Sequence, residues 1–145
     1  MKYLLAFIVF LFLSPVAVSA AERLSVTPAI IDEKALARDI IRHTITVTNT
    51  TSAKMDVYAI VNNVDVESGK QDFLNRADVE LKNSLANWIQ IYRGAVELGP
   101  GESHEFRMTI NVNLNADPND YHAAVSFMWG GSRAFAEKNV KQGVS

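Results

Sequence analysis

One stretch of the sequence, Val96 to Trp129, constrains the fold more than any other. It contains two runs of alternating apolar and polar residues, and each run follows a turn-forming segment, Gly99-Pro100-Gly101 for the first and Asp117-Pro118 for the second. Alternation places every second side chain on the same face of a β-strand, and glycine and proline favour the turns between strands. The stretch therefore predicts two strands that each bury one face, as in an all-β protein.

Both strands have a clearly apolar face. In the first strand that face consists of Phe106, Met108, Ile110, Val112 and Leu114. In the second strand it consists of Tyr121, Ala123, Val125, Phe127 and Trp129. Such faces favour two sheets packed against each other around a shared core.

Four earlier segments also predict strands, namely Leu24–Ile31, Ile41–Asn49, Met55–Val61 and Trp88–Tyr92. Pro28 lacks a backbone N–H, so the first of these strands lies at a sheet edge or carries a kink. Residues 62–83 form a long polar connection, and Ala77–Ala86 has the pattern of a short helix. Six short strands without strand–helix–strand alternation indicate an antiparallel β-sandwich.

The first 20 residues have the pattern of a signal peptide. Lys2 supplies a positive charge, Leu4–Leu13 is an apolar run too short to span a bilayer comfortably, and Val18-Ser19-Ala20 offers the small residues of a cleavage site. An uncleaved membrane anchor is the alternative. We expect residues 1–20 to be removed on export and residues 21–145 to form a single domain in the periplasm, at the cell surface or outside the cell.

Composition excludes several classes of partner and chemistry. The chain has 14 basic and 16 acidic residues, and loss of Lys2 leaves a formal net charge of about −3. These charges are interspersed, which argues against nucleic acid or an anionic membrane as a partner. The chain has no cysteine, which excludes disulfides, thiol catalysis, cysteine metal sites and lipid attachment at an N-terminal cysteine.

Four sequence patterns together carry a family resemblance. They are I-T-V-T-N-T at Ile45–Thr50, W-I at Trp88-Ile89, L-G-P-G-E-S at Leu98–Ser103 and Y-H-A-A-V-S-F at Tyr121–Phe127. From Leu24 to Trp129 the chain resembles the immunoglobulin-like β-sandwich domains of secreted bacterial and archaeal surface proteins, near the pilus-chaperone and fibronectin type III groups. The resemblance implies a non-enzymatic structural or protein-binding module that acts through sheet edges or an outer face, on another protein or on a second copy.

The same resemblance assigns a structural role to Tyr121. In immunoglobulin-like domains a tyrosine corner donates its hydroxyl proton to the backbone a few residues upstream. An ordinary core tyrosine is the alternative.

The pilus-chaperone subgroup fits less well. That family holds its client's carboxylate with one basic residue on the first strand and another on a later strand. Here Arg23 stands at the very start of the first strand, no lysine partner can be assigned, and the sequence has no counterpart of that family's second domain. A periplasmic chaperone or assembly factor that works by β-strand addition therefore remains the alternative function.

The three histidines, His43, His104 and His122, are candidate metal ligands, but their spacing argues against a shared metal site. If the last two strands pair around Asn115–Pro118, His122 lies opposite about Val112, and His104 lies about 25 Å further along. We interpret His43 as a partly buried histidine at the edge of the core. The histidines therefore predict no shared metal ion.

The acidic loop Asn63–Gly69 does not match an EF-hand, because Ser68 and Leu74 occupy the positions that need glycine and glutamate. A looser calcium site at Asp65, Glu67 and Asp72 is the alternative to a solvated loop. No nucleophile elbow, zinc-protease helix or phosphate-binding glycine loop is present. We expect no enzyme, no metal and no cofactor.

Asn49-Thr50-Thr51 matches a glycosylation sequon. We interpret it instead as the end of a strand, because asparagine and threonine suit the turn that follows.

Two groups of side chains are candidates for an interaction site. The first is an apolar patch on the outer face of one sheet, formed by Tyr58, Ile60, Ala124 and Met128 if the third and sixth strands are neighbours. The alternative is that residues 62–83 fold over this face. The second group is an aromatic pair, Trp88 and Tyr92, which would suit a carbohydrate-binding sandwich if both rings were exposed on a flat face.

The tyrosine corner makes the strand of Tyr121 the sixth of seven. Little sequence remains for a seventh, because Arg133–Lys141 is charged and suits a loop or short helix, and only Val140–Ser145 has any strand character. We therefore expect an incomplete sandwich. Either the chain is part of a longer surface protein, or its open groove takes a strand from a partner.

Overall fold

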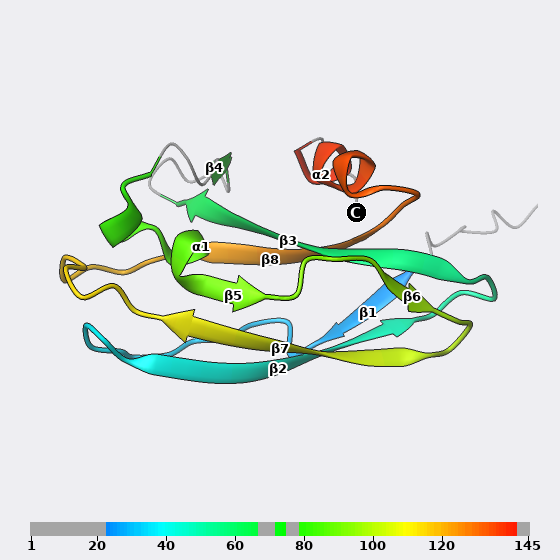
Figure 1. Cartoon of the computed structure of the whole chain (residues 1–145), viewed down its shortest axis with the longest axis horizontal. Coiled ribbons are helices and arrows are strands. Elements are labelled where there is room, and N and C mark those ends of the chain that lie inside the picture. The colour runs from blue at the N-terminus through cyan, green and yellow to red at the C-terminus, as the bar shows by residue number, and fades with distance from the viewer. Residues whose placement is uncertain (1–22, 67–71, 75–78, 142–145) are drawn as a thin grey trace, which may run out of the picture.

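The computed structural model contains two antiparallel β-sheets that face each other (Figure 1). It describes residues 23–66, 72–74 and 79–141, so the expected signal peptide lies outside the described residues. The first sheet has the order β1 (Leu24–Thr27), β2 (Ile40–Asn49), β7 (Ser103–Asn111), β5 (Ile89–Ile91).

β3 is the central strand of the second sheet. It pairs with β8, β4 and β6; the bounds are β3 (Met55–Asp65), β8 (Ala123–Trp129), β4 (Asp72–Leu74) and β6 (Val96–Leu98). Val57 pairs with both β6 and β8, and Asn63 pairs with both β4 and β8. A strand has only two edges, so β8 occupies one edge of β3, and β4 and β6 share the other.

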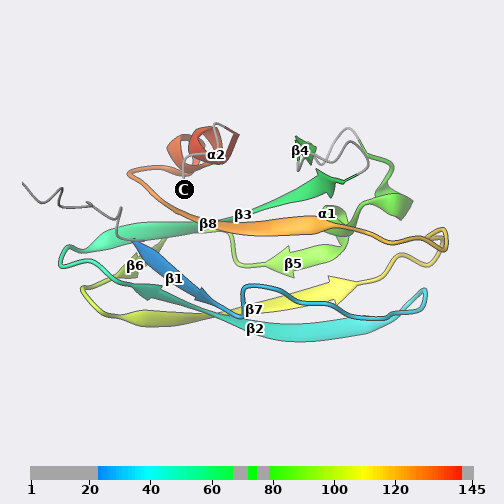
Figure 2. The same ribbon diagram turned by 180° about the vertical axis from the view of Figure 1, so that it is seen from behind.

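Short helices complete the described fold. A 3₁₀ turn (Leu81–Asn83) and α1 (Leu85–Trp88) lead into β5, and α2 (Arg133–Lys141) follows β8 after two glycines. Figures 1 and 2 show α2 lying on the outer face of the second sheet, away from the first sheet. This helix occupies the charged segment for which the sequence predicted a loop or short helix.

The core lies between the inner faces of the two sheets. Phe106 of β7 and Phe127 of β8 meet there with ring centroids 4.8 Å apart. The alternation in the sequence predicted this burial correctly, because Phe106, Met108 and Ile110 are all buried. The buried residues of this core are Ile45, Val47, Val57, Ala59, Val61, Ala86, Trp88, Ile89, Leu98, Phe106, Met108, Ile110 and Phe127.

Several expected boundaries were wrong. The predicted strand Trp88–Tyr92 is only Ile89–Ile91, because Trp88 is the last residue of α1. β7 ends at Asn111 and does not reach Leu114. The last two strands form no hairpin, because β7 and β8 lie in different sheets.

The connection 62–83 also differs from expectation. β3 continues to Asp65, and the three-residue strand β4 pairs with its end. The helix expected at Ala77–Ala86 is replaced by the 3₁₀ turn and α1, while residues 75–78 lie outside the described part. The sequence did not predict the strand β6, which pairs with the start of β3.

The strand order is that of an immunoglobulin-like sandwich. In that fold strands A, B, E and D form one sheet, and C, F and G form the other. β1, β2, β7 and β5 correspond to A, B, E and D, and β3 and β8 correspond to C and F. Among the described residues no strand follows β8 in the position of G. The expected all-β, immunoglobulin-like sandwich is confirmed over this part of the chain, but it contains eight strands instead of six, because β4 and β6 were not predicted.

Asn49 connects two turns at one end of the sandwich. Its buried side-chain amide donates to the carbonyl oxygens of Ala53 (2.7 Å), Leu98 (3.1 Å) and Gly99 (3.0 Å), and its Oδ1 accepts from Thr51 N (2.9 Å). These bonds join the turn after β2 to the turn before β7. The strand-end interpretation of this segment therefore has a physical basis, because a fully buried side chain offers no surface for a glycan.

We predict that Asn49→Ala lowers the free energy of unfolding by about 3 kcal/mol, because it leaves buried carbonyl groups without donors. Urea unfolding followed by circular dichroism measures the loss. Asn115→Ala, at an exposed position, is the matched control and should change stability by less than about 0.5 kcal/mol. Equal losses in the two variants would contradict the role of Asn49.

Candidate interaction site: a groove between β1 and β8

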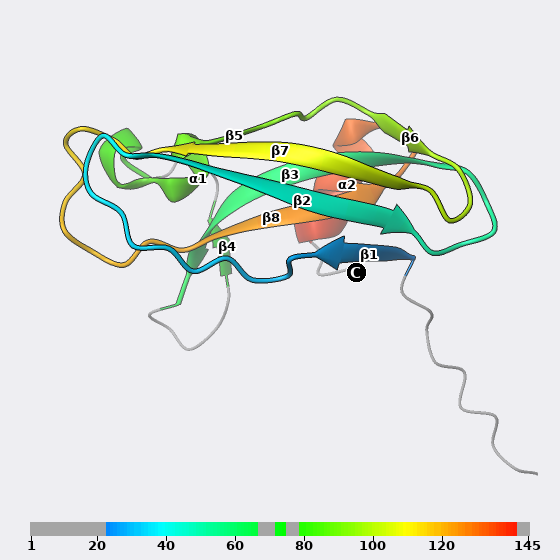
Figure 3. The same ribbon diagram turned by 90° about the horizontal axis from the view of Figure 1, so that it is seen from below.

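The two sheets remain open along one long edge. Figure 3 shows β1 and β8 on this edge, opposite the edge formed by β5 and β6. Among the described residues β1 pairs only with β2, and β8 pairs only with β3. Each strand therefore has one edge with backbone groups that no described strand satisfies, which is the usual site for adding another strand.

A mostly apolar groove of about 490 Å³ lies along this open edge, and its lining extends around β8 to Ala124 and Val64 on the outer face of the second sheet. Its floor is formed by core residues of both sheets, including Ile45, Met108 and Phe127. Along its sides Val26, Ala123 and Val125 are only half-buried, although they pack against the core. Ile30, Val66 and Phe73 are exposed at its mouth, with 85%, 44% and 42% of their surface accessible. Exposed apolar surface of this kind usually marks an interaction site.

The segment after β1 forms one wall of the groove. Pro28 to Ile31 line it, and the loop that follows is fixed against the end of the first sheet. Arg38 N donates to Val112 O (3.2 Å), Val112 N donates to Asp39 O (3.0 Å), and Leu36 N donates to the Asp39 carboxylate (2.8 Å). These bonds fix the end of the loop, just before β2, against the residue that follows β7.

One end of the open edge is closed by Arg23 and Trp129. The Arg23 guanidinium lies 5.1 Å from the centre of the Trp129 ring, within the range of a cation–π contact. Because Arg23 precedes β1 and Trp129 ends β8, this contact joins the two sheets at the end where the strands approach each other.

Tyr121 stands at the other end. Its hydroxyl lies 2.6 Å from Asp117 O and 3.0 Å from Asn83 Oδ1. One hydroxyl carries one proton, so we assign the donated bond to the shorter contact. The acceptor is a backbone carbonyl four residues upstream, the bond expected of a tyrosine corner.

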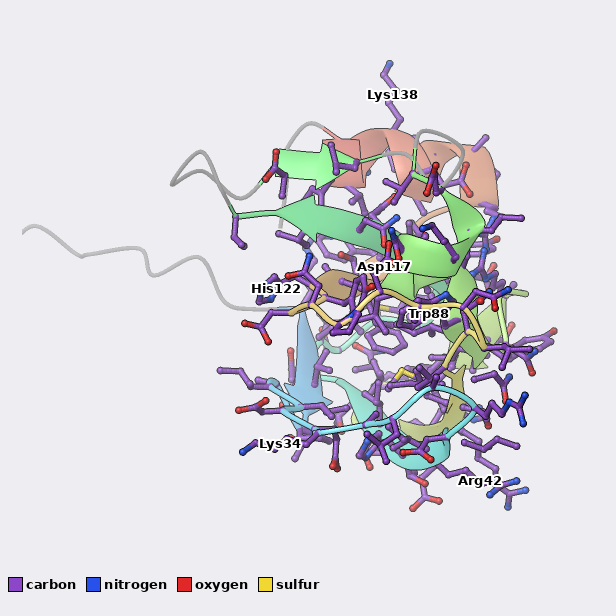
Figure 4. All side chains as sticks on the ribbon, turned by 90° about the vertical axis from the view of Figure 1, so that its left-hand side faces the viewer. Lys34, Arg42, Trp88, Asp117, His122 and Lys138 are labelled. Carbon is purple, nitrogen blue, oxygen red and sulfur yellow. The ribbon has the colours of Figure 1, made fainter. Side chains whose placement is uncertain are left out.

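The ring of Tyr121 packs edge-on against Trp88, with centroids 4.7 Å apart. Figure 4 shows Trp88 pointing between the sheets beneath the loop that carries Asp117. The indole Nε1 donates to Leu81 O (2.9 Å). The groove therefore ends against a rigid aromatic corner.

The charged groups of Lys82 and Asp117 lie next to the Tyr121 hydroxyl and affect its protonation. The hydrogen bond from Lys82 Nζ to Asp117 Oδ2 (2.9 Å) holds the pKa of the Asp117 carboxyl below its ordinary value, and the bond from Asn83 lowers this pKa further. Burial raises the pKa of the Tyr121 phenol, and the negative charge of Asp117 adds to this effect. The phenol therefore stays a proton donor at neutral pH.

The predicted outer-face patch is covered. Tyr58, Ile60 and Met128 are buried, and they form a second core with Ala136 and Val140 of α2. Ala124 is half-buried and lines the groove. The helix α2 packs on this face, so these residues do not form an exposed patch, and their cover in the described part of the chain is α2. Lys138 projects from the far side of the helix in Figure 4.

The predicted aromatic platform is also not formed. Trp88 is buried at 6% exposure, whereas Tyr92 is 61% exposed. The two rings therefore share no flat exposed face, and the carbohydrate-binding interpretation loses its only candidates.

The histidine and acidic side chains that were considered as metal ligands do not form a cluster in the described part of the chain. His104 packs edge-on against Phe106, His122 lines the groove, and His43 Nε2 lies 3.5 Å from Glu33 Oε1. Asp65 pairs in register with Asp72, but Glu67 lies outside the described residues. Across residues 23–66, 72–74 and 79–141, no group of three histidine, aspartate or glutamate side chains could hold a metal ion.

None of the described helices has the length and apolar character needed to cross a lipid bilayer.

Comparisons with known proteins find similar folds and no family. No protein-family model matches the chain, and no curated protein matches its sequence. Among solved structures, the ASH/PapD-like domain of human CEP192 (PapD-like domain 7) has a TM-score of 0.44 and 9% identity, over 91% of this chain and 97% of that chain. A chain of the CsuC–CsuE chaperone–tip adhesion subunit pre-assembly complex, from archaic chaperone-usher Csu pili of Acinetobacter baumannii, has a TM-score of 0.37 and 15% identity, over 69% of this chain and 57% of that chain.

We predict that Tyr121→Phe lowers the free energy of unfolding by about 1 kcal/mol, because the donated bond to Asp117 is lost while the ring still packs on Trp88. Tyr92→Phe is the control, since Tyr92 is mostly exposed, and it should have almost no effect. Chemical unfolding of both variants measures the difference. A Tyr121→Phe protein as stable as the original would contradict the anchoring role.

Proposed function

We propose that the chain is an exported, non-enzymatic immunoglobulin-like module with a structural or protein-binding role at the cell surface or in the periplasm, and that the groove between β1 and β8 binds the partner. The observation that carries this proposal is the combination of a mostly apolar groove of about 490 Å³ with the edges of β1 and β8, which have no strand partner on that side among the described residues.

The chemistry of the groove favours a protein over other partners. Its floor is apolar, which suits aliphatic or aromatic side chains. Its sides carry backbone N–H and C=O groups, which suit a polypeptide backbone. A hydrocarbon chain would leave these groups without partners, and a sugar would need polar groups or exposed rings on the floor.

Export is supported by the sequence of residues 1–20, with its single positive charge, short apolar run and small residues before Ala21. The absence of cysteine fits a domain whose stability comes from its core alone. The core between the two sheets, centred on Phe106 and Phe127, supports that interpretation.

A second candidate function is that of a chaperone or assembly factor acting by β-strand addition. The specific observation that favours it is the edge of β8 along the groove, which pairs with no strand in the described part of the chain. A chaperone releases its client, whereas a structural module keeps its partner, so the dissociation rate of the complex separates the two functions.

We predict that the exported protein begins at Ala21. Intact mass measurement on the protein recovered from the periplasm or medium should give the mass of residues 21–145. Ala20→Arg should block cleavage, because small residues are required there. A protein that keeps residues 1–20 and stays with the membrane would instead support the uncleaved anchor.

We predict that the groove contacts the partner, and two exposed apolar residues on the same segment test this. Ile30 lines the groove and Leu36 does not, although both are largely exposed, at 85% and 77%. A photoreactive amino acid at position 30 should crosslink to a segment of one protein in producing cells, and the same amino acid at position 36 should not.

Binding of the captured protein is then measured with purified variants. Ile30→Asp should weaken it about tenfold, because a charge at the mouth of an apolar groove is costly to bury, and Leu36→Asp should leave it unchanged. Equal effects of the two substitutions would rule out the groove as the binding site.

A further inference from the structure

The direction of the backbone groups on β8 follows from its pairing with β3. Val64 N donates to His122 O (3.0 Å), and Gly130 N donates to Asp56 O (3.1 Å). Both belong to the same antiparallel register, in which residues 61 and 125 are partners. Hydrogen-bonded and non-hydrogen-bonded pairs alternate along such a ladder. The even-numbered residues of β8 therefore bond to β3, and Ala123, Val125 and Phe127 direct their N–H and C=O groups to the open edge.

The same reasoning applies to β1. Thr50 N donates to Arg23 O (3.1 Å), which makes the odd-numbered residues of β1 the ones that bond to β2. Leu24 and Val26 therefore direct their backbone groups to the open edge. Pro28 follows and has no N–H to offer, so β8 presents the longer template for a new strand.

Side chains on β8 add a second constraint. Ala123, Val125 and Phe127 belong to the face of β8 that packs on the core. Residues directly opposite one another in neighbouring strands have side chains on the same face of the sheet. A residue added opposite any of these three would therefore point its side chain into the groove.

β8 is long enough to pair with a segment that directs three side chains into the groove. Three inward side chains at every second position need five residues, or roughly 17 Å of strand, which is within the length of β8.

We infer that the groove takes an extended protein segment that adds to β8 as an antiparallel strand, with three apolar side chains at every second position opposite Ala123, Val125 and Phe127. This inference rests on the proposed function and specifies the partner's chemistry. Antiparallel addition is favoured because every strand pair in the described part is antiparallel and parallel pairing is slightly less stable per residue. The residues between the apolar ones face outward and are polar.

Antiparallel addition predicts which residues of the added strand form backbone hydrogen bonds to β8. In an antiparallel pair, each residue opposite Ala123, Val125 or Phe127 exchanges both of its backbone hydrogen bonds with β8. The same apolar residues then supply both the side chains for the groove and the N–H groups for β8. In a parallel pair, one set of residues would direct its side chains into the groove, and the residues between them would form the backbone hydrogen bonds to β8.

The probe is the peptide acetyl-Lys-Val-Thr-Ile-Thr-Val-Lys-amide, added to the purified chain at millimolar concentration. Its matched control, acetyl-Lys-Thr-Val-Ile-Val-Thr-Lys-amide, has the same composition with its apolar residues adjacent. We expect the probe to raise the Tm of the chain and the control to bind about tenfold more weakly, because the control can direct fewer apolar side chains into the groove. Ile30→Asp should weaken probe binding, and Leu36→Asp should not.

N-methylation of single residues in the probe then tests the backbone pairing. A methyl group on the nitrogen of the central Ile should weaken binding at least about tenfold, because it removes one hydrogen bond to β8 and places bulk against the strand. The same modification on either Thr should change binding less than about twofold. Competition against a fluorescently labelled probe measures all three.

The outcomes separate the inference from the proposed function. Equal binding of probe and control, or equal loss at every N-methyl position, would overturn the strand pairing while leaving protein binding at the groove intact. Loss at the Thr positions instead of Ile would also overturn it, because that pattern belongs to a parallel strand. Absence of groove crosslinks from position 30, together with no binding of either peptide, would overturn the proposed function as well.

Discussion

The packing of Phe106 against Phe127 between the two sheets is the interaction on which the rest of the structure depends. Phe106 comes from the centre of the first sheet and Phe127 from an edge of the second. Their contact holds the sheets together although β8 has only one strand partner among the described residues. The other edge of β8 has no strand partner among the residues that the structure describes, and the groove lies beside it.

The ends of the sandwich limit the length of that groove. Arg23 over Trp129 joins the sheets at one end, and Tyr121 with Trp88 closes the other. Both contacts involve residues at or next to the ends of β1 and β8. The groove is therefore bounded by the fold itself, and the segment that fits it is short. The helix α2 covers Tyr58, Ile60 and Met128 on the outer face of the second sheet.

The alternation of residues predicted β2, β7 and β8 well, because each buries one face and a period of two is visible in the sequence. The same signal failed at Trp88, whose burial comes from a one-turn helix and not from a strand. β4 and β6 have three residues each, too few to show an alternation of apolar and polar residues. They form strands because they pair with β3. Tyr58 and Ile60 were recognised as unusual apolar residues on an outer face, but their cover, α2, contacts them from far along the chain.

The sequence alone determined the class of fold and the tyrosine corner hypothesis. These depend on local patterns of polarity and on turn residues, which act between near neighbours in the chain. Only the tertiary structure decided that β1 and β8 lie on the same open edge and that Ala123, Val125 and Phe127 direct their backbone groups outward from it. That arrangement depends on which strands pair and in which register, and pairing joins residues that are distant in sequence.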